Sequence, residues 1–401
     1  MIFSSAFVPE TGYFAPKFQV MQTIKFRVNN RDDAFFQALQ KEVSTWLDKQ
    51  KNGRYANILM LGKGVLFLSF FWGAYALILF GGFSSIVTIL LYASMGVSGL
   101  LIAFNISHDA CHDALTSSKL FNKVVYYLTF NPLGTDAYLW KLRHVHSHHP
   151  FPNVDHCDID IDNNFLIRLS PNRPLLRHHR WQHVYGPFLY ALYTLHWVFI
   201  KDWAYLFRKD LANLRDIKHP PGEVFGMIAA KAFYFFYLIV LPVGMGLHWA
   251  TVLIGFLALH VVMSYFFLLT NIMNHHAQEA DFPMRDEKGY LPGSWAQHQI
   301  ATCVDFHPKS RVWNFFFGGF NSHAAHHLFP TVCHVHYVML SEFIIDKAAA
   351  YGVAHKQMSW WAALLSHFRH LYDLGHIPLR SQTDQKSQEQ YENHQVSGEQ
   401  P

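Results

Sequence analysis

Four long apolar runs constrain this chain more than any other feature. Each has close to the ~20 residues that a helix needs to cross the hydrocarbon core of a bilayer, and none carries Asp, Glu, Lys or Arg. The sequence therefore predicts an all-α integral membrane protein, with four transmembrane helices in two hairpins and a cytoplasmic helical cap. The runs are Gly64–Phe83, Ser84–Asn105, Ala232–His248 and Trp249–Met273.

A fifth apolar stretch, Val184–Ile200, competes with these four. It is short, opens with Gly186-Pro187 and carries His196. A crossing here would also place strongly basic segments on both sides of the membrane. We therefore expect an interfacial or core helix rather than a fifth span.

Lysine and arginine predict the orientation. Neither short connection within a pair, "GGFSS" or "GLHWA", contains Lys or Arg. The positive-inside rule therefore puts both termini and the long middle segment in the cytoplasm. The expected division is an N-terminal cap (1–56), a hairpin (57–105), a cytoplasmic segment with two histidine motifs (106–231), a second hairpin (232–273), a cytoplasmic segment with a third motif (274–380) and a disordered tail (381–401).

The composition limits the classes of function that we expect. Charged residues make up 15% of the chain, below the ~25% of an average soluble domain, yet the 28 histidines equal the number of acidic residues. We see no dense basic patch interleaved with aromatics, so nucleic acid is not an expected partner. The four cysteines lack CxxC spacing and predict no disulfide framework.

The histidines form four groups in the predicted cytoplasmic segments. Side chains three or four residues apart share one face of a helix, so each group presents one cluster. Two groups follow the ends of predicted spans within about a turn, on the same side of the membrane. The groups are His108 and His112 in HDACH; His144, His148 and His149 in HVHSHH, with His146 pointing away; His275, one turn after Asn271, in NIMNHH; and His323, His326 and His327 in SHAAHH.

These nine imidazoles exceed the four ligands of a tetrahedral zinc site and suit two metal ions. Imidazole binds Zn, Cu, Fe and Ni alike, so the residues alone do not select the metal.

The three motifs HDACH, HVHSHH and HAAHH resemble the histidine boxes of the membrane fatty acid desaturase family. The flanking stretches "RHVHSHHPFPNVDHCDID", "WAQHQIATCVDF" and "GGFNSHAAHHLFPTVCHVHY" are similar too. The resemblance covers about Lys25 to Tyr351. It implies two non-haem iron ions held by the nine histidines, with Asn271 holding a metal-bound water: the implied set is His108, His112, His144, His148, His149, Asn271, His275, His323, His326 and His327.

The resemblance further implies an oxidoreductase that uses O2 and two electrons to insert a double bond into an acyl chain, carried by a membrane lipid or by coenzyme A. His323 departs from the Gln of many front-end members, which puts that regiochemistry in question. "HPPG" at His219 lacks a surrounding cytochrome domain. Electrons are therefore expected from a separate donor, such as a ferredoxin or a cytochrome.

Several other polar residues have expected roles. His260 lies eleven residues before Asn271, about 16 Å along a helix, and is expected to be a satisfied intramembrane polar group. We expect at least two nearby carboxylates to accept the second N–H of ligand imidazoles, as is usual at metal sites. The candidates are Asp109, Asp113, Asp158, Asp160 and Asp305.

Further histidines are expected to stand outside the ligand set. His276 points away from His275; His183 and His298 contact either the ligands or a head group. His178, His179, His334 and His336 are expected to face solvent or the head-group layer. Trp140, Lys141 and Arg143 either meet an acidic head group or act as positive-inside anchors.

Three rival functions stay open at this point. A lipid hydroxylase on the same scaffold differs only in the step that follows the first hydrogen abstraction. A metal transporter would carry its ligands within the spans, where His260 is the only histidine apart from His248 at an end. A bis-histidine haem protein would need histidine pairs at matched membrane depths.

Overall fold

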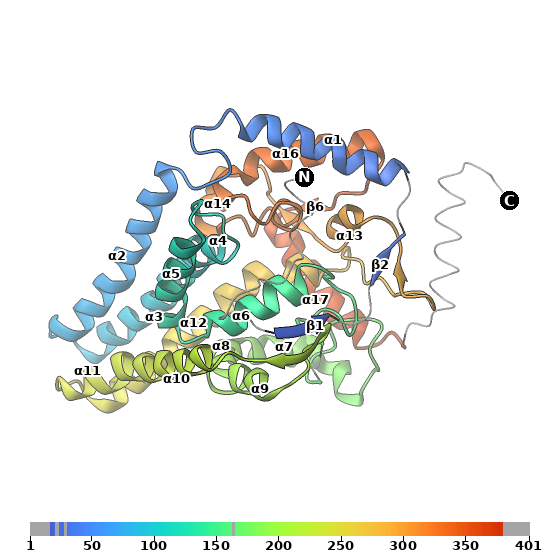
Figure 1. The fold of residues 1–401 in the computed structure, drawn as a ribbon. Helices are drawn as coiled ribbons and strands as arrows, with labels where there is room; N and C mark the ends of the chain where they lie inside the picture. The colour runs from blue at the N-terminus through green and yellow to red at the C-terminus, as the bar shows by residue number, and fades with distance from the viewer. Residues whose placement is uncertain (1–16, 21–23, 28–29, 163–164, 380–401) are drawn as a thin grey trace.

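The computed structural model describes residues 17–20, 24–27, 30–162 and 165–379 (Figure 1). The described chain is mostly helical, and four of its helices are long and apolar enough to cross a membrane. They are α2 (Ile58–Phe80); the continuous rod Ser85–Cys111, made of α3 (Ser85–Ile102), the π-helical turn Ala103–Ser107 and α4 (His108–Cys111); the rod Pro221–Gly244, made of α10 (Pro221–Phe235), the π-helical turn Phe236–Val240 and α11 (Leu241–Gly244); and α12 (Trp249–His275).

These helices are longer than the apolar runs predicted. Lys63 lies inside α2 and Lys231 inside α10, where the sequence placed both before the helix. Both cations are buried, which is tolerable because each is hydrogen-bonded. Lys231 Nζ donates to Asp202 (2.6 Å) and to two carbonyls, and Lys63 Nζ donates to the Phe315 carbonyl. His108 likewise stands on the second rod itself, not beyond it.

The long helices pack closely at α3, which contacts both α2 and α12. Glycine makes the approach to α12 possible. A Cβ at Gly96 would lie 2.5 Å from the Leu259 carbonyl oxygen, and one at Gly255 would lie 2.4 Å from the Tyr92 ring. Small residues at such crossings let transmembrane backbones approach. The outward faces carry exposed apolar side chains, as a lipid-facing surface requires: Ile58, Leu61, Phe70, Phe80, Ile86, Leu90, Phe225 and Trp249.

The stretch 184–200 does not form a fifth span, as expected. It is broken into α7 (Gln182–Ala191), α8 (Tyr193–His196), the π-helical turn Trp197–Lys201 and α9 (Asp202–Phe207), with Pro187 inside α7. None of these pieces could cross a bilayer. Several large apolar side chains on them are exposed, which suits the membrane interface.

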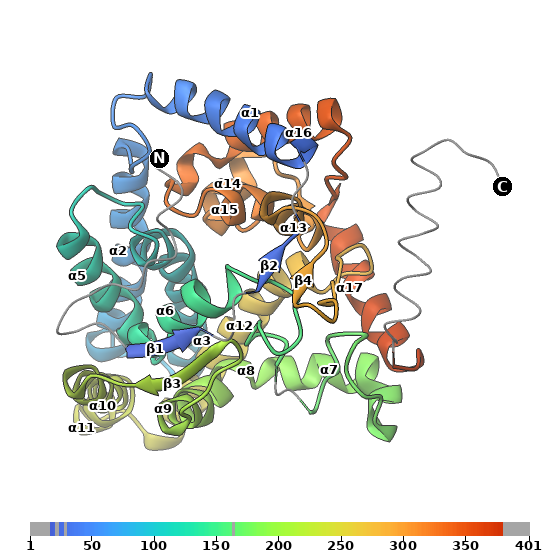
Figure 2. The same ribbon diagram turned by 45° about the vertical axis from the view of Figure 1, so that its right-hand side comes forward.

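The remaining helices form a cap over one end of the long helices (Figures 1 and 2). The expected N-terminal helix, α1 (Asn30–Leu47), packs against α16 (Tyr337–Tyr351) and buries Phe35, Leu39 and Val43. The other cap helices are α5 (Lys119–Phe130), α6 (Ala137–Arg143), α13 (Trp295–Ala301), α14 (Arg311–Phe317), α15 (His323–Leu328) and α17 (Trp360–Leu374).

The all-α expectation needs one amendment, because short strands also occur. The pair β1 (Lys17–Val20) and β3 (Leu214–Lys218) is antiparallel. The other two pairs are parallel: β2 (Lys25–Phe26) with β4 (Tyr290–Leu291), and β5 (Asp305–Phe306) with β6 (Gln357–Met358). The predicted tail 381–401 lies outside the described residues.

Candidate metal centre

All nine predicted histidines meet at one place, where the cap joins the long helices. Two of the segments that carry them contain π-helical turns. One turn, Ala103–Ser107, directly precedes His108, and the other is His144–His148 itself. Such turns rotate the following side chains relative to an α-helix and recur at functional sites.

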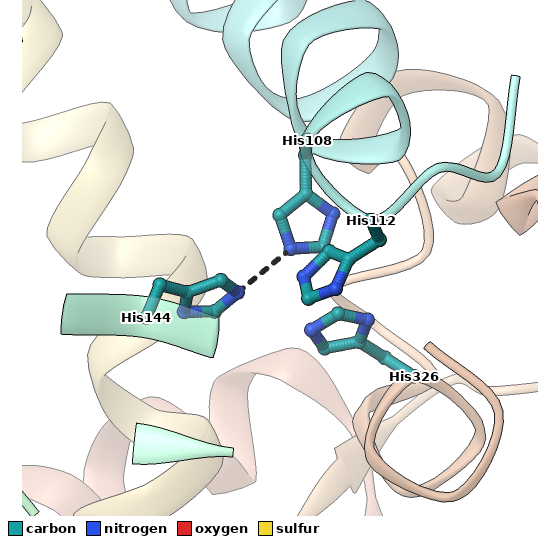
Figure 3. Close-up of side chains that lie close together, drawn as sticks. All are labelled: His108, His112, His144 and His326. Carbon is teal, nitrogen blue, oxygen red and sulfur yellow. Dashed lines mark hydrogen bonds between the residues drawn. The ribbon is translucent and has the colours of Figure 1, made fainter. Parts of the chain in front are cut away.

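The first cluster, group 1, contains His108, His112, His144 and His326 (Figure 3). One imidazole nitrogen from each lies within 4.8 Å of the others. His108 and His112 come from the end of the second rod, His144 from the π-helical turn and His326 from α15, and their rings converge on one point. His108 Nε2 and His144 Nε2 are 3.2 Å apart. This is a spacing that a shared metal ion would produce between its ligands.

The second cluster, group 2, contains His148, His275, His323 and His327. His275 is the last residue of α12, and its Nε2 lies 2.8 Å from His323 Nε2 and 3.1 Å from His327 Nε2. His149, His326 and His327 form a third overlapping cluster. His149 therefore lies between the two groups, and the arrangement offers two adjacent metal positions.

The chemistry of these side chains fits metal ions. In the described part of the chain, His112 Nε2 and His326 Nε2 are buried and have no hydrogen-bond partner. Burial, and then the neighbouring imidazoles, hold six ligand pKa values well below the ordinary range, so these rings are neutral, the form that binds metal. They are His112, His144, His149, His323, His326 and His327.

The imidazoles of group 2 are oriented by hydrogen bonds at Nδ1, the ring nitrogen that lies away from the centre of the cluster. His275 Nδ1 donates to the Thr302 carbonyl (2.9 Å), and His327 Nδ1 donates to Gln299 Oε1 (2.8 Å). The Asn274 amide N–H donates to His323 Nδ1 (3.1 Å) and to the Phe320 carbonyl (2.8 Å). The bonds donated by His275 and His327 fix those rings and leave Nε2 facing the centre.

Only one of the expected carboxylates, Asp158, accepts a hydrogen bond from an imidazole of the two groups. Asp158 lies 3.0 Å from His148 Nδ1, and Asp160 is 3.7 Å from the same nitrogen. Burial is the largest single influence and lowers the pKa of His148, but the Asp158 and Asp160 carboxylates together leave that pKa raised. The expectation of at least two such carboxylates was too generous. Asp109 bonds His334, and Asp305 accepts from the Ala324 N–H at the start of α15 and contacts His355.

Comparison with known proteins identifies the family. The family model described as "Fatty acid desaturase" matches residues 84–359, more than half of the chain. This chain belongs to the fatty acid desaturase family. The family is one of oxidoreductases that desaturate fatty acids.

Curated relatives of this desaturase carry related names. An "Acyl-lipid (8-3)-desaturase" of Physcomitrium patens is 28% identical over 362 residues, covering 89% of this chain and 75% of the relative. An "sn-1 linoleoyl-lipid 6-desaturase" of Synechocystis sp. is 28% identical over 350 residues, covering 85% and 95%. An "Acyl-lipid (8-3)-desaturase" of Mortierella alpina is 30% identical over 292 residues, covering 71% and 64%.

A large cavity of about 690 Å³ opens beside group 2 of the desaturase. Its wall includes His148, His275 and His323 together with Asn271, the residue one turn before His275. Most other lining side chains are apolar, among them Leu189, Leu195, Phe267 and Leu268. A smaller apolar cavity of about 40 Å³ reaches His108 and shares Trp140, Phe267 and Phe320 with the first. The two cavities together run past both histidine groups.

Other histidines of the desaturase partly depart from expectation. His260 is fully buried and bonded to Thr194 and Tyr234 (both 2.9 Å), which confirms a satisfied intramembrane group. His178 is exposed, but His179, His334 and His336 are buried, against the prediction. His334 lies between Asp109 (2.7 Å) and Lys63 (2.6 Å), because α2 and the end of the second rod enclose it. His276 and His298 are buried but outside the three metal clusters.

Sequence reasoning missed the supporting residues Asn274, Gln299 and Thr302. Gln299 and Thr302 stand in "WAQHQIATCVDF", which resembled the family, but attention there fell on His298. Asn274 directly precedes His275. Proximity to a motif was the available signal, and only the fold shows which neighbour contacts which imidazole.

Proposed function

We propose that this chain is a multi-pass membrane acyl-lipid desaturase that inserts a double bond into the acyl chain of a lipid. The names of its relatives support the substrate class, and they favour desaturation over the rival hydroxylase. The observation that carries the proposal is the pair of four-histidine groups beside a cavity with largely apolar walls.

We propose two iron ions as the metals, one at group 1 and one at group 2, with His149 between them. Asn271 is proposed to hold a water at group 2, because it lines the same cavity one turn before His275. With both ions bound, the centre would use O2, two electrons and two protons to remove two hydrogens from neighbouring carbons, releasing water.

The protein's own part is to bind and orient the acyl chain. The chain is proposed to lie along the apolar wall of the large cavity and to pass Phe320 into the small one. There Leu100, Leu133 and Met263 lie between the membrane helices. Apolar walls exclude bulk water and strengthen the interactions that position the reacting carbons.

We also propose an orientation of the protein in the membrane and a source for its electrons. Both termini and the metal centre are proposed to be cytoplasmic, as the charge pattern predicts, with the segment boundaries that the apolar runs predict. Two electrons are proposed to come from a separate ferredoxin or cytochrome. An acyl chain linked to coenzyme A is the alternative substrate.

Expression in a bacterial host tests the proposal. Lipids extracted from the host should contain a new unsaturated acyl chain, and the purified protein should hold two iron ions. Exclusive production of hydroxylated chains would replace desaturase by hydroxylase. Zinc in place of iron, with no change in the lipids of a host that supplies ferredoxin, would remove the proposal altogether.

A further inference from the structure

Lys63 is a cation inside the membrane helix α2 that points into the protein. Lysines near the ends of membrane helices usually extend toward the water interface, but Lys63 is buried. Its Nζ lies 2.6 Å from His334 Nε2 and 3.1 Å from the Phe315 carbonyl oxygen, and among the described residues no carboxylate lies within ion-pair distance of it. Lys231 on α10, in contrast, pairs directly with Asp202 (2.6 Å). A buried charge is costly unless it is compensated, so His334 has to link Lys63 to its counter-ion.

His334 provides this link to the carboxylate of Asp109. A lysine ammonium carries donors only, so Lys63 Nζ donates to His334 Nε2, and Nε2 is the ring nitrogen without a proton. The proton of the neutral ring is therefore on Nδ1, which donates to Asp109 Oδ2 (2.7 Å). The same oxygen accepts from the His334 backbone N–H (3.3 Å) and from the Cys333 thiol (2.8 Å). Lys63 thereby selects the tautomer of His334 that can bond to Asp109.

This relay of Lys63, His334 and Asp109 joins two segments that carry group 1. Asp109 lies between His108 and His112, in the last turn of the second rod. His334 follows α15, the helix that carries His326. The bonds at Asp109 therefore tie the turn with two histidines of group 1 to the segment after the helix with a third. A metal ion shared by these rings needs that separation to be fixed, because metal–ligand distances tolerate only small deviations.

A metal ion bound within the relay is the alternative reading. Asp109, Cys333 and His334 each offer a ligand atom within 4.8 Å of the others. Their hydrogen bonds are already matched, however, since the thiol and Nδ1 donate to the carboxylate and Nε2 accepts from Lys63. The ammonium of Lys63, which bonds the same imidazole, would also repel a second cation. The geometry therefore favours a hydrogen-bonded relay.

We propose that Lys63 is a positioning residue for group 1. Through the tautomer of His334 it holds Asp109, and with Asp109 the turn that carries His108 and His112, at the distance from His326 that a shared metal ion requires. The inference rests on the proposed function, since it assumes that a metal ion binds at group 1.

The relay should act on group 1 more than on group 2. The imidazoles of group 2 have bonds of their own, from His275 to the Thr302 carbonyl and from His327 to Gln299. None of these four residues bonds to a member of the relay. Loss of the relay is therefore expected to weaken one metal position selectively.

Lys63→Met tests the relay, because methionine fills the space of the lysine stem but donates nothing. His334 can then carry its proton on Nε2, and the Nδ1 lone pair would face the Asp109 carboxylate. Iron(II) affinity at group 1 should fall roughly tenfold, and at group 2 by less than about threefold. Iron titration of the purified full-length apo protein, followed by Mössbauer spectroscopy, separates the two positions.

Two substitutions of His334 test the role of its tautomer without altering a membrane helix. His334→Asn places an amide N–H where Nδ1 stood and has no tautomer to select, so group 1 should keep most of its iron affinity. His334→Gln places its amide near the Nε2 position and cannot donate from the Nδ1 position, so it should resemble Lys63→Met. Adding Lys63→Met to His334→Asn should change the affinity of group 1 by less than about twofold.

Lys231→Met is the matched control for the loss of a buried ammonium. Lys231 is as buried as Lys63 and donates to a carboxylate and two carbonyls, but it lies outside the relay. This variant should lower Tm without discriminating between the two groups. Hydrogen–deuterium exchange of the apo protein adds a readout that needs neither iron nor activity. Residues 329–336 should exchange faster in Lys63→Met than in Lys231→Met.

Three results would overturn the proposal. They are equal loss of iron from both groups in Lys63→Met, equal iron affinity at group 1 in His334→Asn and His334→Gln, and a third metal ion per chain that Cys333→Ser removes. Failure of the proposed function gives a different pattern. A protein that shows the exchange difference at residues 329–336 but alters no lipid in the host would keep the relay and lose the desaturase assignment.

Discussion

The two histidine groups are held in different ways. Every imidazole of group 2 has a partner behind it: Asp158, Thr302, Asn274 or Gln299. In group 1, among the described residues, His108 and His144 are hydrogen-bonded only to other histidines of the centre, His144 also to His149 (3.1 Å), and His326 Nδ1 lies 3.4 Å from the Tyr337 hydroxyl. Ring contacts orient that group instead. His144 stacks on Trp140 at 4.2 Å, and His108 lies 4.7 Å from Phe320.

This difference bears on how firmly each group would hold the metal ion proposed for it. A hydrogen bond donated by Nδ1, as at His148, His275 and His327, selects the tautomer whose Nε2 lone pair faces the centre, and it raises the basicity of the ring. A stacking contact fixes the plane of the imidazole but does not select which ring nitrogen carries the proton. Hydrogen bonds therefore orient the imidazoles of group 2 before a metal binds, whereas ring contacts orient those of group 1. We expect a chelator to remove an ion bound at group 1 first.

The largest effect is expected where the groups meet. His326 belongs to group 1 and to the cluster with His149 and His327. His326→Ala should reduce desaturation of host lipids more than a hundredfold, because catalysis needs both ions, and iron content should fall to one per chain or less. The lipid profile and metal analysis of purified protein measure both. His178→Ala, which changes an exposed histidine outside all three clusters and both cavities, is the control. Retained activity in His326→Ala would contradict the ligand assignment.

The next effect tests the hydrogen bonds of group 2. Asp158→Asn keeps the shape but weakens the acceptor for His148 Nδ1, so iron affinity at group 2 should fall about 10- to 100-fold. Group 1 should keep its ion. Iron titration followed by Mössbauer spectroscopy separates the two positions. Asp216→Asn, which alters an exposed carboxylate, should match wild type. Equal loss from both groups would mean that they bind metal as one unit.

Acidification should destabilise the metal-free protein. The six histidines with depressed pKa values bind fewer protons when folded than when unfolded, so stability is present above the unfolded value of about 6.5 and is lost as pH falls below it. His148 has a raised pKa and contributes with the opposite sign. Thermal unfolding of apo protein in detergent should show Tm falling between pH 7 and 5. A flat profile would exclude neutral, buried imidazoles.

Sequence reasoning predicted the histidines that cluster because their positions are locally encoded. His323, His326 and His327 share a helix face, and His275 ends an apolar helix, so spacing and position alone predicted that they converge. The number of spans followed from apolar length in the same way. The π-helical turns at Ala103–Ser107 and His144–His148 were not foreseen, because they change the rotation without changing the spacing.

The supporting residues could not be predicted because they are contacts between distant segments. His334 was expected at the surface, yet it is enclosed by Asp109 and Lys63, more than two hundred residues away in sequence. Gln299 reaches His327 from α13, and Gly318 approaches so closely that a Cβ there would lie 2.3 Å from the Phe104 carbonyl oxygen. Tertiary packing decides which of several polar neighbours supports a ligand.

The smallest effect is expected at the ring contacts of group 1. Trp140→Phe keeps an aromatic face against His144, and aromatic contacts contribute only about 0.5–1.5 kcal/mol, so iron affinity at group 1 should fall less than tenfold. Iron titration of this variant and of Asp158→Asn compares the contribution of ring stacking to iron affinity with that of the hydrogen bond. Trp361→Phe, on the exposed face of α17, is the matched control. If Trp140→Phe lost more iron than Asp158→Asn, stacking rather than the carboxylate would be the stronger support, and the order of metal release under chelation should reverse with it.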